Sequence, residues 1–233
     1  KLPIGIQSFK EIRTRGYLYV DKTPFIAQMF TAGKYYFLSR PRRFGKSLFV
    51  DTLDCAFSGK EELFRGLYLS EEEAAWDFHT AYPILRIDFA GGIMKTPEEL
   101  RERLFRMITT WEELYHTRKT EGTPGERLLS LVPDIVHTTG SQVVILIDEY
   151  DKPMLDNLDN IPLAIAMRET LKDFYSAIKP LDEHLRFVFL TGVSKFAKAG
   201  IFSGLNNLKD ITLEMRYSAI CGYTEKDLME TFS

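Results

Sequence analysis

The stretch that decides the fold of this 233-residue chain is Ser39-Arg40-Pro41-Arg42-Arg43-Phe44-Gly45-Lys46-Ser47. It follows the short apolar run Tyr35-Tyr36-Phe37-Leu38 and precedes apolar residues at helical spacing between Leu48 and Phe57. The stretch therefore joins a predicted strand to a predicted helix. Its end matches the phosphate-binding pattern Gly-x-x-x-x-Gly-Lys-Ser/Thr, but Arg40 stands where that pattern has its first glycine.

These residue types suit an anionic ligand. Gly45 lets backbone N–H groups approach phosphate oxygens, and a helix that begins near Lys46 directs its positive end at them. Lys46 can reach the β- and γ-phosphates, and the Ser47 hydroxyl can ligate Mg²⁺. Four cations fall within seven residues, and we expect some of them to contact phosphates or a neighbouring subunit. The alternative is a solvated basic turn. The predicted binding loop is Arg40, Pro41, Arg42, Arg43, Phe44, Gly45, Lys46, Ser47 and Leu48.

A second motif ends the most apolar predicted strand. Residues 143–147 are all aliphatic, which favours a central parallel strand buried on both faces, and Asp148-Glu149 follow. Asp148 would hold Mg²⁺ opposite Ser47, and Glu149 would act as general base on water. The alternative is an acidic turn that binds no ligand. A chance match is disfavoured because both motifs occur in the same chain. Their separation leaves room for one strand with its helices, as in NTPases that have an extra strand between the two motifs.

The rest of the chain alternates short apolar runs with helical stretches. Further strands are predicted at 83–89, 186–192 and 211–213, and helices at 24–30, 97–114, 126–137 and 163–178. This alternation predicts an α/β fold with a mostly parallel sheet of about five strands. At the end of the 186–192 strand, Thr191 or Ser194 is expected to sense the γ-phosphate; capping of the next turn is an equal alternative.

Composition excludes several classes. The 30 Lys and Arg nearly balance the 33 Asp and Glu, so the chain as a whole is a poor non-specific nucleic-acid binder, although a local basic patch is left open. No apolar run reaches the ~18–20 residues that cross a bilayer, so no membrane partner is expected. The two cysteines, Cys55 and Cys221, form no disulfide framework, and we expect a cytoplasmic location.

The chain resembles the bacterial AAA-ATPase-like family of P-loop proteins nearly from end to end. The stretches that carry this resemblance are Leu2–Ile6, Tyr19–Thr23, Arg40–Ser47, Ile147–Asp151, Leu190–Ser194, Phe202–Leu208 and Cys221–Glu225. The resemblance implies a three-layer P-loop NTPase fold of the ASCE or AAA-like kind. It also implies that Arg40 belongs to the usual loop of this family.

The resemblance also implies a domain organisation. We expect an N-terminal segment over 1–34, a core over 35–220, and the start of a truncated helical lid over 221–233. Relatives often continue into a PD-(D/E)XK nuclease-like domain, so a C-terminal effector domain is expected to be missing here. No nuclease signature follows Gly222. The chain begins with Lys1, so the natural N-terminus is also expected to be missing.

The sequence therefore predicts an ATPase that uses ATP and Mg²⁺ and couples its nucleotide state to an effector or partner. One alternative is a nucleotide-gated switch or scaffold with little or no turnover. A phosphotransferase and a nucleic-acid motor are less favoured, because no acceptor signature stands out and the basic loop suits nucleotide phosphates. Homo-oligomer formation is left open. In-trans finger candidates are Lys195, Lys198 and Arg216, with surface roles favoured.

Overall fold

A single parallel sheet forms the centre of the computed structural model, which describes residues 1–195, 201–202, 205 and 207–231. The strands are β1 (Tyr35–Ser39), β2 (Ile84–Asp88), β3 (Val143–Asp148), β4 (Leu185–Gly192) and β5 (Lys209–Asp210). Their order is β2-β3-β4-β1-β5, and all neighbours run parallel. In the sheet, β4 thus lies between β1, which precedes the phosphate loop, and β3, which ends at Asp148. The strand that lies between the two motifs in the sequence is β2, and it stands at the edge of the sheet beyond β3.

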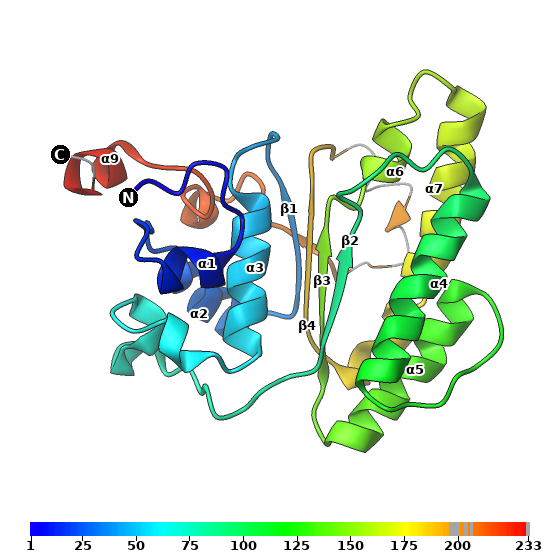
Figure 1. Cartoon of the computed structure of the whole chain (residues 1–233), viewed down its shortest axis with the longest axis horizontal. Coiled ribbons are helices and arrows are strands. Elements are labelled where there is room, and N and C mark those ends of the chain that lie inside the picture. Colours follow the sequence, from blue (N-terminus) through cyan, green and yellow to red (C-terminus); the bar gives the residue numbers. More distant parts are fainter. Residues whose placement is uncertain (196–200, 203–204, 206, 232–233) are drawn as a thin grey trace.

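Helices cover both faces of the sheet and complete the three predicted layers (Figure 1). On one face lie α1 (Phe9–Thr14), α2 (Thr23–Ala32) and α3 (Lys46–Phe57), and on the other α4 (Pro97–Leu114), α5 (Pro124–Thr139) and α7 (Ile161–Ser176). Two further helices are α6 (Lys152–Leu155) and α9 (Glu225–Thr231). Short 3₁₀ helices occur at Glu61–Leu63, Tyr68–Ser70, Glu72–Ala74, Lys179–His184 and Met215–Tyr217.

The sheet separates two hydrophobic cores because successive strand side chains point to opposite faces. Tyr35 and Phe37 pack with α4, α5 and α7, whereas Tyr36 and Leu38 pack with α2 and α3. Every residue of β1 and β3 is buried. The continuous apolar runs of the sequence therefore mark central strands covered on both sides, as predicted.

Local capping sets several helix boundaries. Thr123 and Glu126 form a capping box, and Pro124 takes the first turn, so α5 begins two residues before the predicted start. Ser8 caps α1, a six-residue helix that the periodicity does not predict. The α1 backbone is tied to α3 by the Phe9 N–H, which donates to Asp51 Oδ2 at 2.7 Å.

The prediction of a fifth strand at 211–213 is wrong by two residues. The strand is Lys209–Asp210, and Ile211 N–H still donates to Phe37 O at 3.0 Å. Thr212 N–H instead turns back to Asp210 Oδ1 at 3.0 Å, which ends the strand. Ile211 is fully buried in the hydrophobic core that also contains the buried residues of α3, which accounts for its apolar side chain.

Parallel pairing brings the carboxyl ends of the strands to one edge of the sheet. Ser39 at the end of β1 is opposite Gly192 in β4, and Asp88 is opposite Asp148. Ligands of open α/β sheets bind at this edge. No helix in the described part of the chain is both long and apolar enough to cross a bilayer.

Candidate functional site

The predicted phosphate loop connects β1 to α3 at the carboxyl edge. Gly45 has φ 89° and directly precedes α3, and no side chain caps the helix. The first N–H groups of α3 are therefore left without a side-chain acceptor, which is the usual geometry of an anion site. Arg43 also has a left-handed backbone, with φ 61°. Ser47 and Leu48 follow in the first turn of α3, both partly buried.

Lys46 spans the loop. Its ammonium group donates to the carbonyl oxygens of Arg40 and Pro41, at 2.9 Å each. The side chain is only 6% exposed, and this burial lowers the pKa of Lys46, although nearby Asp148 and Glu149 oppose the shift. A phosphate group that took this ammonium would therefore replace two carbonyl acceptors of the loop.

Arg40 does not point into the loop. Its guanidinium donates to the backbone oxygens of Thr212 at 2.6 Å and Tyr217 at 3.5 Å, both in the C-terminal part of the chain. By contrast, Arg42 and Arg43 are exposed and make no hydrogen bond or ion pair with a described residue. Of the four cations, these two and Lys46 are thus the ones that a phosphate can recruit without breaking a side-chain contact to the C-terminal segment.

Asp148 and Thr191 form a buried pair at the ends of β3 and β4. The Thr191 hydroxyl donates to Asp148 Oδ1 at 2.5 Å, and the two residues are 0% and 2% exposed, respectively. Thr191, one of the two predicted sensor residues, is therefore bonded to the predicted metal ligand. Its hydroxyl fixes the orientation of the carboxylate.

Glu149 follows in an unusual conformation. Its φ of 54° is left-handed, which is uncommon for a residue with a side chain and costs about 1–2 kcal/mol. The next N–H, that of Tyr150, donates to Thr191 O at 3.0 Å and stabilises this bend. Burial, reinforced by Asp148, raises the pKa of Glu149. Such strain at the end of a central strand is typical of functional sites.

Sequence reasoning missed the support behind Ser194. Asp151 is 1% exposed and accepts from the N–H groups of Val193 at 3.0 Å and Ser194 at 2.6 Å. The Tyr150 hydroxyl donates to Ser194 O at 2.5 Å. These bonds hold the turn after β4 against the turn after β3. The only signal in the sequence is the residue order Asp-Glu-Tyr-Asp at 148–151.

Gly192 makes this contact feasible. A Cβ at this position would lie 2.3 Å from Tyr150 Cε1 and 2.7 Å from Asp151 Oδ1. Only glycine allows the two turns to approach so closely. The sequence signal is a glycine directly after the strand-end threonine.

Two of the candidate finger residues, Lys195 and Arg216, pair with acidic side chains of the C-terminal part of the chain. Lys195 Nζ lies 3.7 Å from Asp210 Oδ2, and Arg216 Nε donates to Glu214 at 2.7 Å, which fits the favoured surface roles. Lys198 lies outside the described residues.

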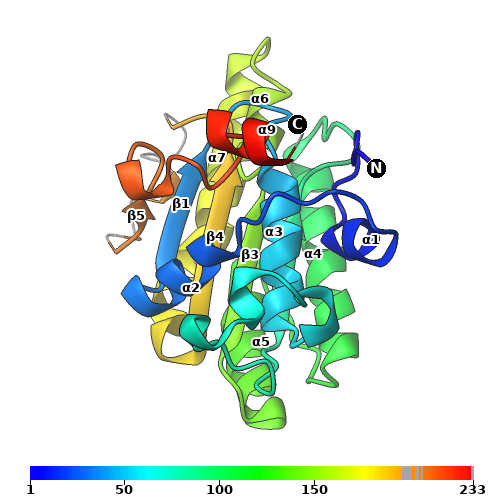
Figure 2. The same ribbon diagram turned by 90° about the vertical axis from the view of Figure 1, so that its left-hand side faces the viewer.

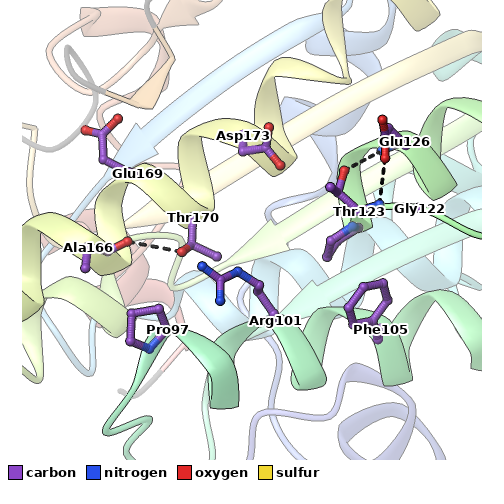
Figure 3. A pocket seen from close by; sticks show the side chains of 11 residues that line it. Pro97, Arg101, Phe105, Gly122, Thr123, Glu126, Ala166, Glu169, Thr170 and Asp173 are labelled. Atoms are coloured by element: carbon purple, nitrogen blue, oxygen red, sulfur yellow. Dashed lines mark hydrogen bonds between the residues drawn. The ribbon is translucent and has the colours of Figure 1, made fainter.

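A separate hollow of about 710 Å³ lies in the helical layer on the other face of the sheet (Figure 3). It is open between α4, the start of α5 and α7, with Arg101, Glu126 and Asp173 on its walls. None of the predicted site residues lines it.

The sheet order, the uncapped loop-to-helix junction and the Asp148–Glu149 pair define an α/β protein with a P-loop NTPase-like fold. The chain belongs to the AAA-ATPase-like family, described as "Predicted AAA-ATPase", whose family model matches residues 3–202. This finding confirms the resemblance seen in the sequence.

One curated relative is an "Uncharacterized protein in vnfD 5'region" from Azotobacter chroococcum mcd 1. It is 47% identical over 234 residues, a match that covers 100% of this chain and 45% of the relative. The chain thus spans about half the length of the relative. No solved structure matches the chain significantly.

Proposed function

We propose that the chain binds ATP with Mg²⁺ at residues 40–48 and hydrolyses it. The observation that carries this proposal is the position of the Lys46 ammonium. It is buried at the uncapped start of α3, close enough to Asp148 and Glu149 for their charges to act on its pKa, and within the described part of the chain it is held by two loop carbonyls. A buried ammonium with such exchangeable acceptors suits a β- or γ-phosphate oxygen.

The residues present fit a magnesium ion. Mg²⁺ in proteins keeps several waters and binds through one or two protein oxygens together with substrate phosphates. Asp148 and Ser47 would supply these oxygens, and the Thr191 hydrogen bond already orients the Asp148 carboxylate. When bound, Mg²⁺ would neutralise charge that develops on the phosphates.

The other residues have distinct proposed roles. Gly45 and the first turn of α3 bind phosphate oxygens through N–H groups, and Lys46 neutralises their charge. Arg42 and Arg43, exposed at the tip of the loop, add positive charge. Glu149 takes a proton from the attacking water as general base, and its raised pKa brings it nearer to the pH of the reaction. Thr191 or Ser194 senses the γ-phosphate.

The domain organisation is part of the proposal. We place an N-terminal segment at 1–34, the NTPase core at 35–220 and the start of a lid at 221–233. The ion pair between Lys22 and Asp227, 3.0 Å apart, supports contact between the first and last of these parts. Coupling of the nucleotide state to an effector or partner is a further part of the proposal.

The test is ATP binding and steady-state hydrolysis by the wild type, Lys46→Ala and Glu149→Gln, with the surface variant Lys60→Ala as control. We expect Lys46→Ala to lose binding and Glu149→Gln to bind ATP but turn over about 10²–10⁴-fold more slowly. A wild type that binds no ATP contradicts the proposal. A wild type that retains ATP without measurable turnover favours the nucleotide-gated switch.

A further inference from the structure

Arg40 joins two parts of the molecule through one residue. Its backbone carbonyl oxygen accepts a hydrogen bond from the Lys46 ammonium at 2.9 Å. On its side-chain side, the guanidinium donates to Thr212 O and Tyr217 O. Arg40 therefore contacts both the proposed phosphate ligand and the segment that follows the sheet.

The C-terminal segment 211–227 contacts the loop at both ends. Near the start of the loop, Ser39 N–H donates to the Thr212 hydroxyl at 3.0 Å. Near its end, the Phe44 ring packs against Gly222, where a Cβ would lie 2.9 Å from Phe44 Cε1. Gly222 has φ 75°, so this position suits glycine both for its backbone and for its close neighbour.

The same segment continues into α9, which lies on the side of the sheet that α1, α2 and α3 cover (Figure 2), at the outer edge of the molecule (Figure 1). Asp227 in α9 accepts both the Lys22 ammonium at 3.0 Å and the Thr224 N–H at 2.8 Å. The segment 211–227 is thus fixed to the loop and to the N-terminal segment at once.

We propose that Arg40 is a positioning residue that couples occupancy of the phosphate loop to the C-terminal segment 211–227; this inference rests on the proposed function. When the Lys46 ammonium turns to a phosphate, the carbonyl of Arg40 loses its donor and the loop backbone rearranges. The guanidinium carries that change to Thr212 and Tyr217. By linkage, the position of the segment also sets the affinity for nucleotide. This explains why an arginine can replace the first loop glycine: its side chain leaves the loop.

Hydrogen exchange of the amides in 211–227, measured with and without Mg·ATP, tests the coupling. In the wild type we expect ATP to change exchange in this segment severalfold. In Arg40→Ala we expect that change to disappear, together with about tenfold weaker ATP binding. Arg40→Lys keeps a hydrogen-bond donor, so it should restore part of the ATP-dependent exchange and part of the ATP affinity. If the Arg40→Ala protein had lost both only because it failed to fold, this partial recovery would not be expected from a restored donor.

Arg13→Ala is the matched control. Arg13 also donates to two backbone oxygens, those of Leu63 at 2.7 Å and Arg65 at 2.6 Å, but it does so away from the loop. It should lose stability as Arg40→Ala does and keep the ATP-dependent exchange. If the wild type binds ATP and exchange in 211–227 is the same with and without it, or if Arg40→Ala keeps the wild-type response, the coupling is wrong while the ATP site stands. If the wild type binds no ATP, the proposed function fails as well.

Discussion

At the scale of single residues, the buried hydrogen bond from Thr191 to Asp148 orients the carboxylate that is proposed to bind Mg²⁺. The Thr191 hydroxyl donates a hydrogen bond to the Asp148 carboxylate, and Asp148 is only 2% exposed. Partners that orient a metal ligand typically contribute 10–100-fold to metal affinity or activity, so we expect a loss of about that size in the apparent Mg²⁺ affinity for Thr191→Val. Titration of ATP hydrolysis with Mg²⁺ measures it.

Thr191→Ser serves as the control for this prediction because it keeps the hydroxyl and removes only the methyl group. It should retain most of the Mg²⁺ affinity. Equal Mg²⁺ dependence in Thr191→Val and the wild type would show that the hydroxyl does not position Asp148.

The space around position 192 admits only a glycine. An added methyl group would overlap the Tyr150 ring and the Asp151 carboxylate, and forced overpacking costs about 1–3 kcal/mol. We expect Gly192→Ala to lower the free energy of unfolding by about 2 kcal/mol or more in urea denaturation. Gly16→Ala is the comparison: it has φ 64° but open space, so only backbone strain of about 1 kcal/mol applies. A smaller loss at Gly192 than at Gly16 contradicts the packing argument.

At the scale of elements, a buried ion pair joins α4 to α5. Glu112 has a fully buried side chain, and Arg127 Nη2 lies 2.5 Å from its Oε2. Removal of one partner leaves a buried charge, so Glu112→Ala should cost about 3–5 kcal/mol of unfolding free energy. The neighbouring Glu113→Ala removes a pair that is exposed on both sides and should cost less than about 1 kcal/mol. Urea denaturation of both variants measures the two losses of unfolding free energy, and equal losses would contradict the prediction.

The contact between α9 and the N-terminal segment should depend on pH. Burial would raise the pKa of Asp227, but its hydrogen bonds from Thr224 and Lys22 outweigh burial and hold that pKa below its ordinary value. A carboxyl group with a lowered pKa stabilises the fold above its ordinary pKa, and this stabilisation is lost as the pH falls through the lowered value. We expect the wild type to exceed Asp227→Asn in unfolding free energy at pH 7 and the difference to shrink below about pH 4.

The measurement is urea unfolding of both proteins from pH 7 to pH 3, with the exposed Asp159→Asn as control. A difference between wild type and Asp227→Asn that stays constant over this range would argue against the ion pair.

Apolar periodicity predicts the elements well and their junctions less well. Apolar spacing predicts most of the regular elements, because an element that is buried on one or both faces has apolar residues at regular intervals. These elements are the strands β1 to β4 and the helices α2, α3, α4, α5 and α7. The short α1 depends on the Ser8 cap, and the end of β5 depends on a side-chain bond from Asp210. Neither leaves a periodic signal.

At the scale of the whole molecule, the candidate site is assembled from residues far apart in the sequence. Lys46, Asp148 and Glu149 can be predicted from motifs, since each motif is local. The direction of Arg40 cannot, because its acceptors lie 172 and 177 residues away. Likewise, the role of Asp151 depends on backbone groups 42 and 43 residues further on. The Arg40 pairing follows from the parallel neighbours β1 and β5, and the Asp151 pairing from the parallel neighbours β3 and β4; no local pattern predicts either.

Because the site joins β1, α3, β3, β4 and the segment 211–227, a bound nucleotide should stabilise the fold as a unit. A ligand at about 100 times its Kd stabilises the native state by about 2.7 kcal/mol. For a chain of this size, that corresponds to a rise in Tm of about 5–10 °C. We expect this rise for the wild type with Mg·ATP or a non-hydrolysable analogue, and none for Lys46→Ala, whose Tm without ligand provides the baseline. A shift of equal size in Lys46→Ala would place nucleotide binding elsewhere on the molecule, since the buried ammonium is the group that the phosphates are proposed to recruit.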